Sequence, residues 1–281
     1  MPAEDTSLTE SVLRRDRWIV AAGLAAITAL SWAYIMAGAG MGMPAWHMIS
    51  VSLFPHRMAG MAAPMEGMGL HSVHGSPGYW LIVLAMWWTM MIAMMTPSAA
   101  PMILLYARAT RHAHASGRLQ QGVVPTAAFA GGYLLVWLAF SVAATALMWA
   151  LERIGALSAA TMGSSAAWAS AALLIAAGFY QLSPLKHACL RVCRAPAEFL
   201  SRHWRPGSSG ALRMGLAHGV FCVGCCWALM ALLFVGGIMN VLWIAALAIL
   251  VLLEKVAPQG AWISRATGVL LLAWGAMTLA V

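Results

Sequence analysis

The chain has 281 residues, of which 62% are hydrophobic and only 9% are charged. Its mean hydropathy of +0.81 excludes an ordinary soluble globule and indicates several transmembrane helices. A net charge of +8 can accompany nucleic-acid binding, but the placement of the basic residues indicates a membrane topology instead.

Seven apolar stretches have lengths that suit membrane-crossing helices, although the sixth, at about 25 Å, is short. In chain order they are 18–38, 79–107, 122–150, 164–185, 212–236, 240–256 and 262–281. We predict an all-α, polytopic helical membrane protein, organised as a polar tail (1–17), a first helix (18–38), an outer loop (39–77) and a six-helix core (79–281). The first stretch ends like a signal-peptidase site but is too long for a typical cleaved signal, so we expect a retained anchor. Gly236-Gly237 leaves a tight turn, which predicts a helical hairpin over 212–256.

The basic residues predict the orientation of the chain. Fourteen of the 16 Lys and Arg residues fall in the connections 1–17, 108–121, 186–213 and 255–265. Because such residues are retained on the cytoplasmic side, we expect a cytoplasmic N-terminus and an external C-terminus. The basic excess then faces anionic membrane lipids, and no nucleic-acid partner is expected.

The fifth stretch contains the densest group of potential ligands, His218-Gly-Val-Phe-Cys222-Val-Gly-Cys225-Cys226. At about 100° per residue, His218, Cys222 and Cys225 fall within a narrow arc, with Cys226 at its edge. Cys222 follows Arg213 by about 14 Å of helix, which places it near the centre of a ~30 Å hydrocarbon core. Gly215 and Gly219 border the same face and should let another helix approach closely.

The second stretch brings thioethers to the same depth. Met86, Met90 and Met94 repeat every four residues and form a stripe, and Met95 follows directly. Pro97 cannot donate to the carbonyl of Ala93, so we expect a kinked helix there. Ion sites of membrane transporters often lie at such interruptions.

Each feature also has a plainer interpretation. Methionine stripes usually fill a core, and buried cysteines often behave as small hydrophobic residues. A histidine between helices is usually a hydrogen-bonded structural residue. The occurrence of all three types at one depth favours a functional metal or redox site.

Sulfur and imidazole groups also lie on both predicted membrane faces. The outer loop contains seven methionines and four histidines, and thioethers suit Cu(I) in an oxidising exterior, unless the loop is merely flexible. On the inner side, Cys189 and Cys193 lie one helical turn apart among basic residues. They form an exit site, a regulatory pair or ordinary surface cysteines.

Several other chemistries are not supported. Cys222 and Cys225 have no second CxxC pair at a zinc-ribbon distance, and no βαβ pattern surrounds them as in thioredoxin. The chain has no phosphate-binding loop, so we do not expect ATP hydrolysis.

Three blocks in combination, 90–102, 183–194 and 215–230, resemble a bacterial family of uncharacterised, predicted metal-binding integral membrane proteins. The resemblance covers roughly residues 79–281 and implies metal binding without an established activity. The candidate ligands are His218, Cys222, Cys225, Cys226, Met90, Met94, Met95, Cys189 and Cys193.

The leading hypothesis is a multi-pass protein of the bacterial inner membrane that binds a soft metal ion for transport or delivery. Copper as Cu(I) is favoured because thioethers adjoin the thiols, and zinc is the alternative ion. Its partners would be membrane lipids, the metal ion and a periplasmic or cytoplasmic metal chaperone. The rival hypotheses are a redox or metal-containing membrane enzyme subunit that uses the cysteines, and an assembly partner in which the motifs only pack helices.

Overall fold

The computed structural model describes residues 4–40, 76–115, 124–155, 157–158, 163–164 and 167–280. Most of the predicted outer loop, residues 41–75, lies outside this part of the chain. The described helices are α1 (Glu4–Met36), α3 (Pro77–Ala115), α4 (Val124–Arg153), α5 (Ala167–Leu182), α6 (Pro184–Arg194), α7 (Pro196–His203), α8 (Gly207–Ala231), α9 (Leu233–Gly236), α10 (Val241–Val256) and α11 (Gly260–Ala280). Two two-residue strands, β1 (Leu157–Ser158) and β2 (Gly163–Ser164), pair between α4 and α5. The predicted all-α class is confirmed, and α1 continues through most of the segment predicted as a polar tail.

Five helices among the described residues are long and apolar enough to cross a membrane: α1 from Trp18, α3, α4, α8 together with α9, and α11. Helices α5 and α6 meet at a bend of 63° and could form a sixth, broken span. The prediction of about seven spans is therefore approximate. It also counted α10, whose 16 residues extend only about 24 Å, less than the ~30 Å hydrocarbon core.

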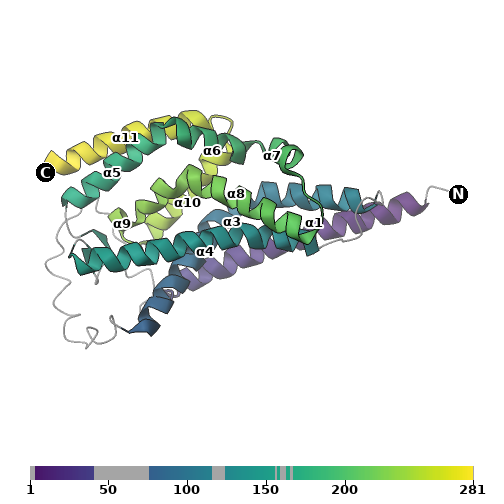
Figure 1. The fold of residues 1–281 in the computed structure, drawn as a ribbon, viewed down its shortest axis with the longest axis horizontal. Coiled ribbons are helices and arrows are strands. Elements are labelled where there is room, and N and C mark those ends of the chain that lie inside the picture. Colours follow the sequence, from purple (N-terminus) through teal and green to yellow (C-terminus); the bar gives the residue numbers. More distant parts are fainter. Residues whose placement is uncertain are drawn as a thin grey trace.

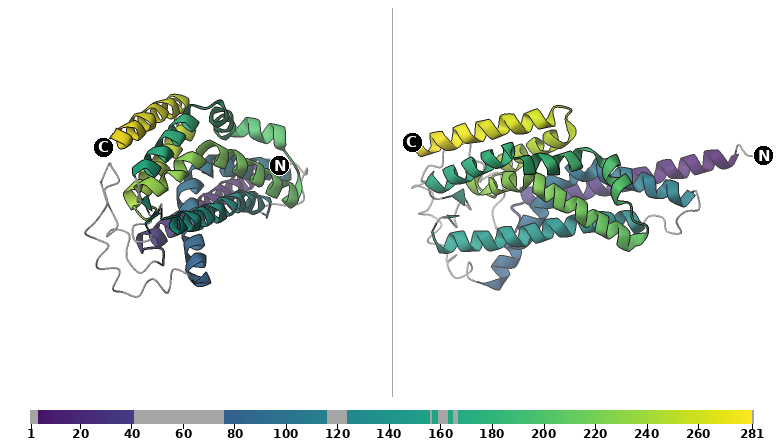
Figure 2. Two further views of the ribbon diagram at one scale, coloured as in Figure 1. Left: turned by 60° about the vertical axis from the view of Figure 1, so that its left-hand side comes forward. Right: turned by 45° about the horizontal axis from the view of Figure 1, so that its top comes forward.

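The helices form an elongated bundle, and the start of α1 and the end of α11 lie at opposite ends of its long axis (Figure 1). Helix α8 packs mainly against α4 and α6, and α1 packs along α3. Helices α5 and α11 lie side by side in both further views (Figure 2). In their most apolar stretches, 56% of α8 with α9 and 50% of α3 is buried, against 22% of α4. Helices α3 and α8 therefore supply most of the interior.

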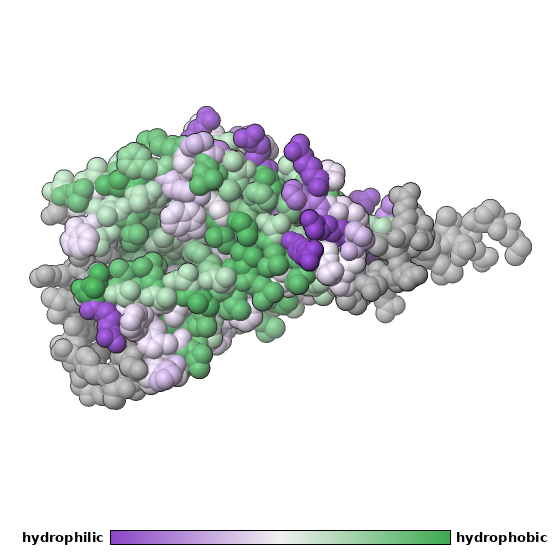
Figure 3. Space-filling view, in the orientation of Figure 1, coloured by the Kyte–Doolittle hydropathy of each residue, from purple (hydrophilic) through white to green (hydrophobic). Residues whose placement is uncertain are grey.

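The surface has the distribution of a membrane-spanning bundle. Apolar side chains cover a broad part of the visible face, and hydrophilic residues gather towards the end of the bundle that carries α7 (Figure 3). Large exposed apolar residues occur on several helices, including Trp168, Trp262 and Leu270. Exposed residues of this size cost little when they face lipid, so the surface is compatible with a multi-pass membrane protein.

Two sequence features shape the interior as predicted. Gly237 has a φ of 87°, a left-handed conformation that glycine adopts without strain, and it turns the chain between α9 and α10. This turn closes the predicted hairpin. Helix α3 contains Pro97 and Pro101 and changes direction along its length, which confirms the predicted kink (Figure 1).

Candidate metal centre between α3, α6 and α8

The thiols of α8 face the interior of the bundle. His218, Cys222 and Cys226 are spaced four residues apart and form one stripe along the helix. These three residues and Cys225 are at most 3% exposed. The thiols of Cys225 and Cys226 donate to the carbonyl of Cys222, at 3.1 and 3.0 Å, which fixes both side chains against their own helix.

Helix α4 approaches α8 closely because α8 carries glycines on that side. A Cβ atom at Gly215 would overlap the carbonyl oxygen of Phe129, and one at Gly219 would lie 2.9 Å from Val136. The close approach predicted for these glycines is confirmed. It brings Tyr133 of α4 to the thiol stripe, with its hydroxyl 3.1 Å from Cys222 Sγ.

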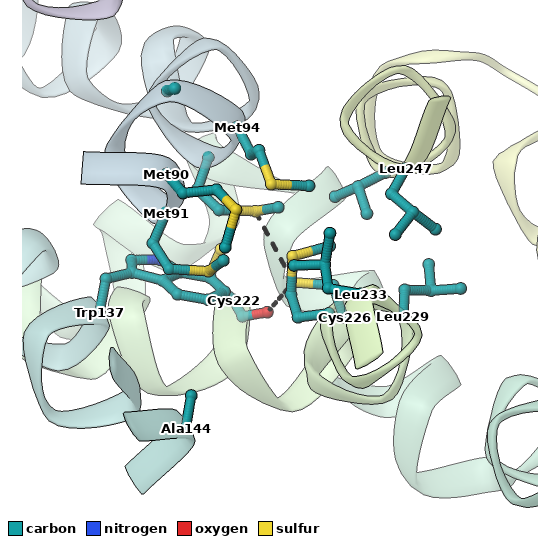
Figure 4. Close-up of a cluster of buried hydrophobic side chains, with 14 of the residues drawn as sticks. Met90, Met91, Met94, Trp137, Ala144, Cys222, Cys226, Leu229, Leu233 and Leu247 are labelled. Atoms are coloured by element: carbon teal, nitrogen blue, oxygen red, sulfur yellow. Dashed lines mark hydrogen bonds between the residues drawn. The ribbon is translucent and has the colours of Figure 1, made fainter. Parts of the chain in front are cut away.

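Helix α3 supplies the thioethers. Met95 Sδ lies 3.9 Å from Cys226 Sγ, and both residues are almost completely buried. Figure 4 shows Met90 and Met94 directed into the same space between α3 and α8 as Cys222 and Cys226. We call Met95, Cys222 and Cys226, with Met90 and Met94 beside them, the sulfur centre.

The kinked part of α3 forms a polar wall for the sulfur centre. Its Met95 carbonyl accepts hydrogen bonds from Tyr133 at 3.1 Å and from Ser98 at 2.9 Å. Ser98 lies between Pro97 and Pro101, whose nitrogens cannot donate to the carbonyls of Ala93 and Pro97. Hydroxyl and carbonyl groups therefore line α3 next to the thiols.

Lys255, which its position in the sequence suggested was a loop cation, lies against the sulfur centre. Lys255 is only 7% exposed, and its ammonium donates to Cys222 Sγ at 2.9 Å and to Ser98 Oγ at 3.0 Å. Because α10 is short, its last turn reaches the sulfur centre and does not extend beyond the bundle. The signal was a charged pair, Glu254-Lys255, that follows directly on an unbroken apolar run.

A buried ion pair adjoins the sulfur centre. Glu254 accepts from Lys186 at 2.6 Å and from Gln181 at 2.8 Å, and Lys186 also donates to Gln181. Lys186 was likewise counted as a loop cation, yet its side chain is fully buried. Arg194 donates to the Glu254 carbonyl at 2.9 Å. The bonds from Lys186 and Arg194 fasten α6 to the end of α10.

His218 lies in an aromatic pocket, and no hydrogen bond among the described residues joins it to the thiols. The rings of Phe129, Tyr133 and Phe199 surround it, with centroids 5.4 to 6.1 Å away. Its Nδ1 atom is buried without a hydrogen-bond partner. Of the four candidates on α8, His218 is therefore the one that is separated from the sulfur contacts by aromatic packing.

The two cysteines of α6 meet the other side of α8. Cys193 Sγ lies 3.9 Å from Cys225 Sγ. Cys189 packs against Gly224, where an added Cβ would lie 2.8 Å from the cysteine sulfur. The pair predicted on the inner face is therefore joined to the buried thiols, although both α6 cysteines are partly exposed.

The available donors are soft ones. Within the described residues, no three His, Cys, Asp or Glu side chains gather closely enough to hold a metal ion by themselves. The groups that do meet are thiols with a thioether or with another thiol, and all five cysteines are free. Thioethers bind Cu(I) and contribute little to Zn(II) sites.

Residues 84–278, more than two thirds of the chain, match the model of the PpoB2 family, which is described as a copper chaperone. This range nearly coincides with residues 79–281, over which the motifs resemble a metal-related family, and that metal-related character is confirmed. No curated protein and no solved structure gives a significant match.

Proposed function

Because this chain belongs to the PpoB2 copper chaperone family, we propose that it holds Cu(I) at the sulfur centre and delivers it to an acceptor. The apolar bundle then serves to keep a reactive monovalent ion away from water and from oxidants. The acceptor would be another soft-metal protein on one side of the bacterial inner membrane, such as a metal chaperone.

The contact between Cys226 and Met95 carries this proposal. Metal–sulfur bonds are near ~2.3 Å, so two sulfurs bound to one ion at 120° lie about 4.0 Å apart. The observed separation of 3.9 Å between these sulfurs matches that value without a movement of either helix. Further sulfur ligands could come from the neighbouring side chains of Cys222, Met90 and Met94 (Figure 4).

The chemistry of the donors favours Cu(I) over Zn(II). A thioether needs no deprotonation and prefers soft, monovalent copper, whereas structural zinc sites use four thiolate or imidazole ligands. Lys255 supplies a positive charge beside Cys222, so that a thiolate there is compensated inside the bundle. One further thiolate then balances a monovalent ion, whereas a divalent ion would need two.

Cu(I) binding by the purified, reduced protein tests the proposal. The protein in detergent is titrated with Cu(I) without oxygen, against a chelator of known affinity. Wild type should retain copper, and Met95→Leu should bind it at least about tenfold more weakly, a loss of roughly 1.4 kcal/mol. Met148→Leu, a buried methionine of α4, is the matched control and should bind like wild type. A wild-type protein that holds no Cu(I) would refute the proposal.

Delivery is distinguished from transport in proteoliposomes. A delivery protein should pass bound copper to a chelator on one side without accumulation of copper in the lumen, whereas a transporter should fill the lumen. Turnover of a thiol or electron donor without copper transfer would favour the redox enzyme subunit instead.

A further inference from the structure

A second pair of sulfur atoms lies on the side of α8 that faces α6. Cys225 Sγ is 3.9 Å from Cys193 Sγ, the same separation as that between Cys226 and Met95. Cys225 and Cys226 are consecutive, so their side chains leave the helix about 100° apart. One turn of α8 therefore presents one thiol to a thioether of α3 and the next thiol to a thiol of α6.

The two pairs differ in their access to water. Met95, Cys225 and Cys226 are at most 1% exposed, whereas Cys193 is partly exposed. Cys193 lies in the last turn of α6, directly before Arg194. The Cys193–Cys225 pair thus links a buried residue of α8 to a partly exposed residue of α6.

Contacts with α8 and with α10 fix the position of α6. Gly224 leaves room for Cys189, and Tyr180 of α5 donates to the Gly224 carbonyl. On its other side, α6 is fastened by Lys186 and Arg194 to the end of α10. These contacts hold Cys193 at a distance from Cys225 that one soft ion can bridge.

We propose that Cys193 and Cys225 form a second Cu(I) site. We call it the exchange site, because copper passes through it from the sulfur centre to the acceptor protein. This inference rests on the proposed function. In the exchange, the bond from copper to Cys226 breaks as a bond to Cys225 forms, and the proton released by Cys225 is taken up by Cys226. Copper remains Cu(I), so no oxidant or reductant is consumed. An acceptor's thiol then replaces Cys193 in the same way.

Thiol labelling of the wild-type protein tests the exchange site without a substitution that could alter the fold. The full chain, reduced and purified in detergent, is treated with a water-soluble maleimide with and without Cu(I), and each cysteine is quantified by mass spectrometry. Copper should slow the labelling of Cys193 at least several-fold and leave Cys189, one turn earlier on the same helix, unchanged. Equal labelling of Cys193 with and without bound copper would overturn the inference.

Copper stoichiometry provides the second test. Cys193→Ser should bind one ion fewer than wild type and release the remainder to a chelator more slowly, whereas Cys193→Met, which keeps a soft ligand, should restore the lost ion. A Cys193→Ser protein that binds as many copper ions as wild type would refute the proposed exchange site and leave the proposed function intact. A wild type without any copper would instead refute the proposed function.

Discussion

Cys222 is set apart from the other thiols of α8 by its polar neighbours. Tyr133 and Lys255 both reach its sulfur, from α4 and α10. A thiol that served only as packing would not need two buried hydrogen-bonding partners, each of which is costly to place in an apolar interior. This arrangement is the one expected of the proposed copper ligand, because Tyr133 would orient its sulfur and Lys255 would balance its charge.

Tyr133→Phe tests that control at a single atom. The substitution removes the hydroxyl from Cys222 and from the Met95 carbonyl and keeps the ring in place. Loss of a group that orients a ligand typically weakens metal binding about 10- to 100-fold, and we expect a Cu(I) affinity reduced within that range. Tyr106→Phe is the control, because Tyr106 is a buried tyrosine stacked on Phe129. Equal copper affinities of the two variants would contradict a role for the Tyr133 hydroxyl.

At the scale of helices, the contact between α4 and α8 positions Tyr133. Gly215→Ala would force a Cβ atom against the Phe129 carbonyl, and overpacking of this kind costs about 1–3 kcal/mol. We expect a lower resistance to SDS unfolding and weaker Cu(I) binding, because the helices separate near Cys222. Gly131→Ala on α4 is the matched control, since nothing lies within 4 Å of its added Cβ. It should be neutral or slightly stabilising.

The junction of α6 with α10 depends on a buried ion pair. Glu254→Gln leaves the Lys186 ammonium buried without its counter-charge, a change that typically costs about 3–5 kcal/mol. We expect a large loss of stability in the same unfolding assay and partial recovery in the Lys186→Met/Glu254→Leu double variant. Glu198→Gln breaks the exposed pair with Arg202 and should cost less than about 1 kcal/mol. Similar losses for Glu254→Gln and Glu198→Gln would show that the buried pair does not hold α6.

For the whole molecule, the basic residues predict one orientation. A fluorescent reporter fused after His203 should mature in the cytoplasm, and alkaline phosphatase fused after Ala280 should be active outside. An external C-terminus requires α10 to return the chain to the cytoplasmic face before α11 begins, although α10 has only 16 residues. Fluorescence from a reporter fused after Ala280 would place the end of α11 in the cytoplasm and refute the predicted topology.

The parts of the site that lie on one helix were predictable from sequence. Helical periodicity placed His218, Cys222 and Cys225 within one narrow arc with Cys226 at its edge, and all four are buried. It did not show that Cys226 meets α3 whereas Cys225 meets α6. Gly215 correctly indicated a close neighbour. Which methionine comes nearest was not predictable: the stripe favoured Met94, but the kinked helix brings Met95 to Cys226. Lys255 was missed because its position depends on how far a short helix reaches into the bundle, which is a tertiary property.

The account depends on copper bound by sulfur from two helices. X-ray absorption at the copper edge of the Cu(I)-loaded protein measures this directly. Wild type should show a shell of sulfur atoms near ~2.3 Å, and the Cys226→Ser/Met95→Leu variant should lose sulfur from that shell. A shell of nitrogen and oxygen atoms in wild type, or an unchanged sulfur shell in the double variant, would contradict the account.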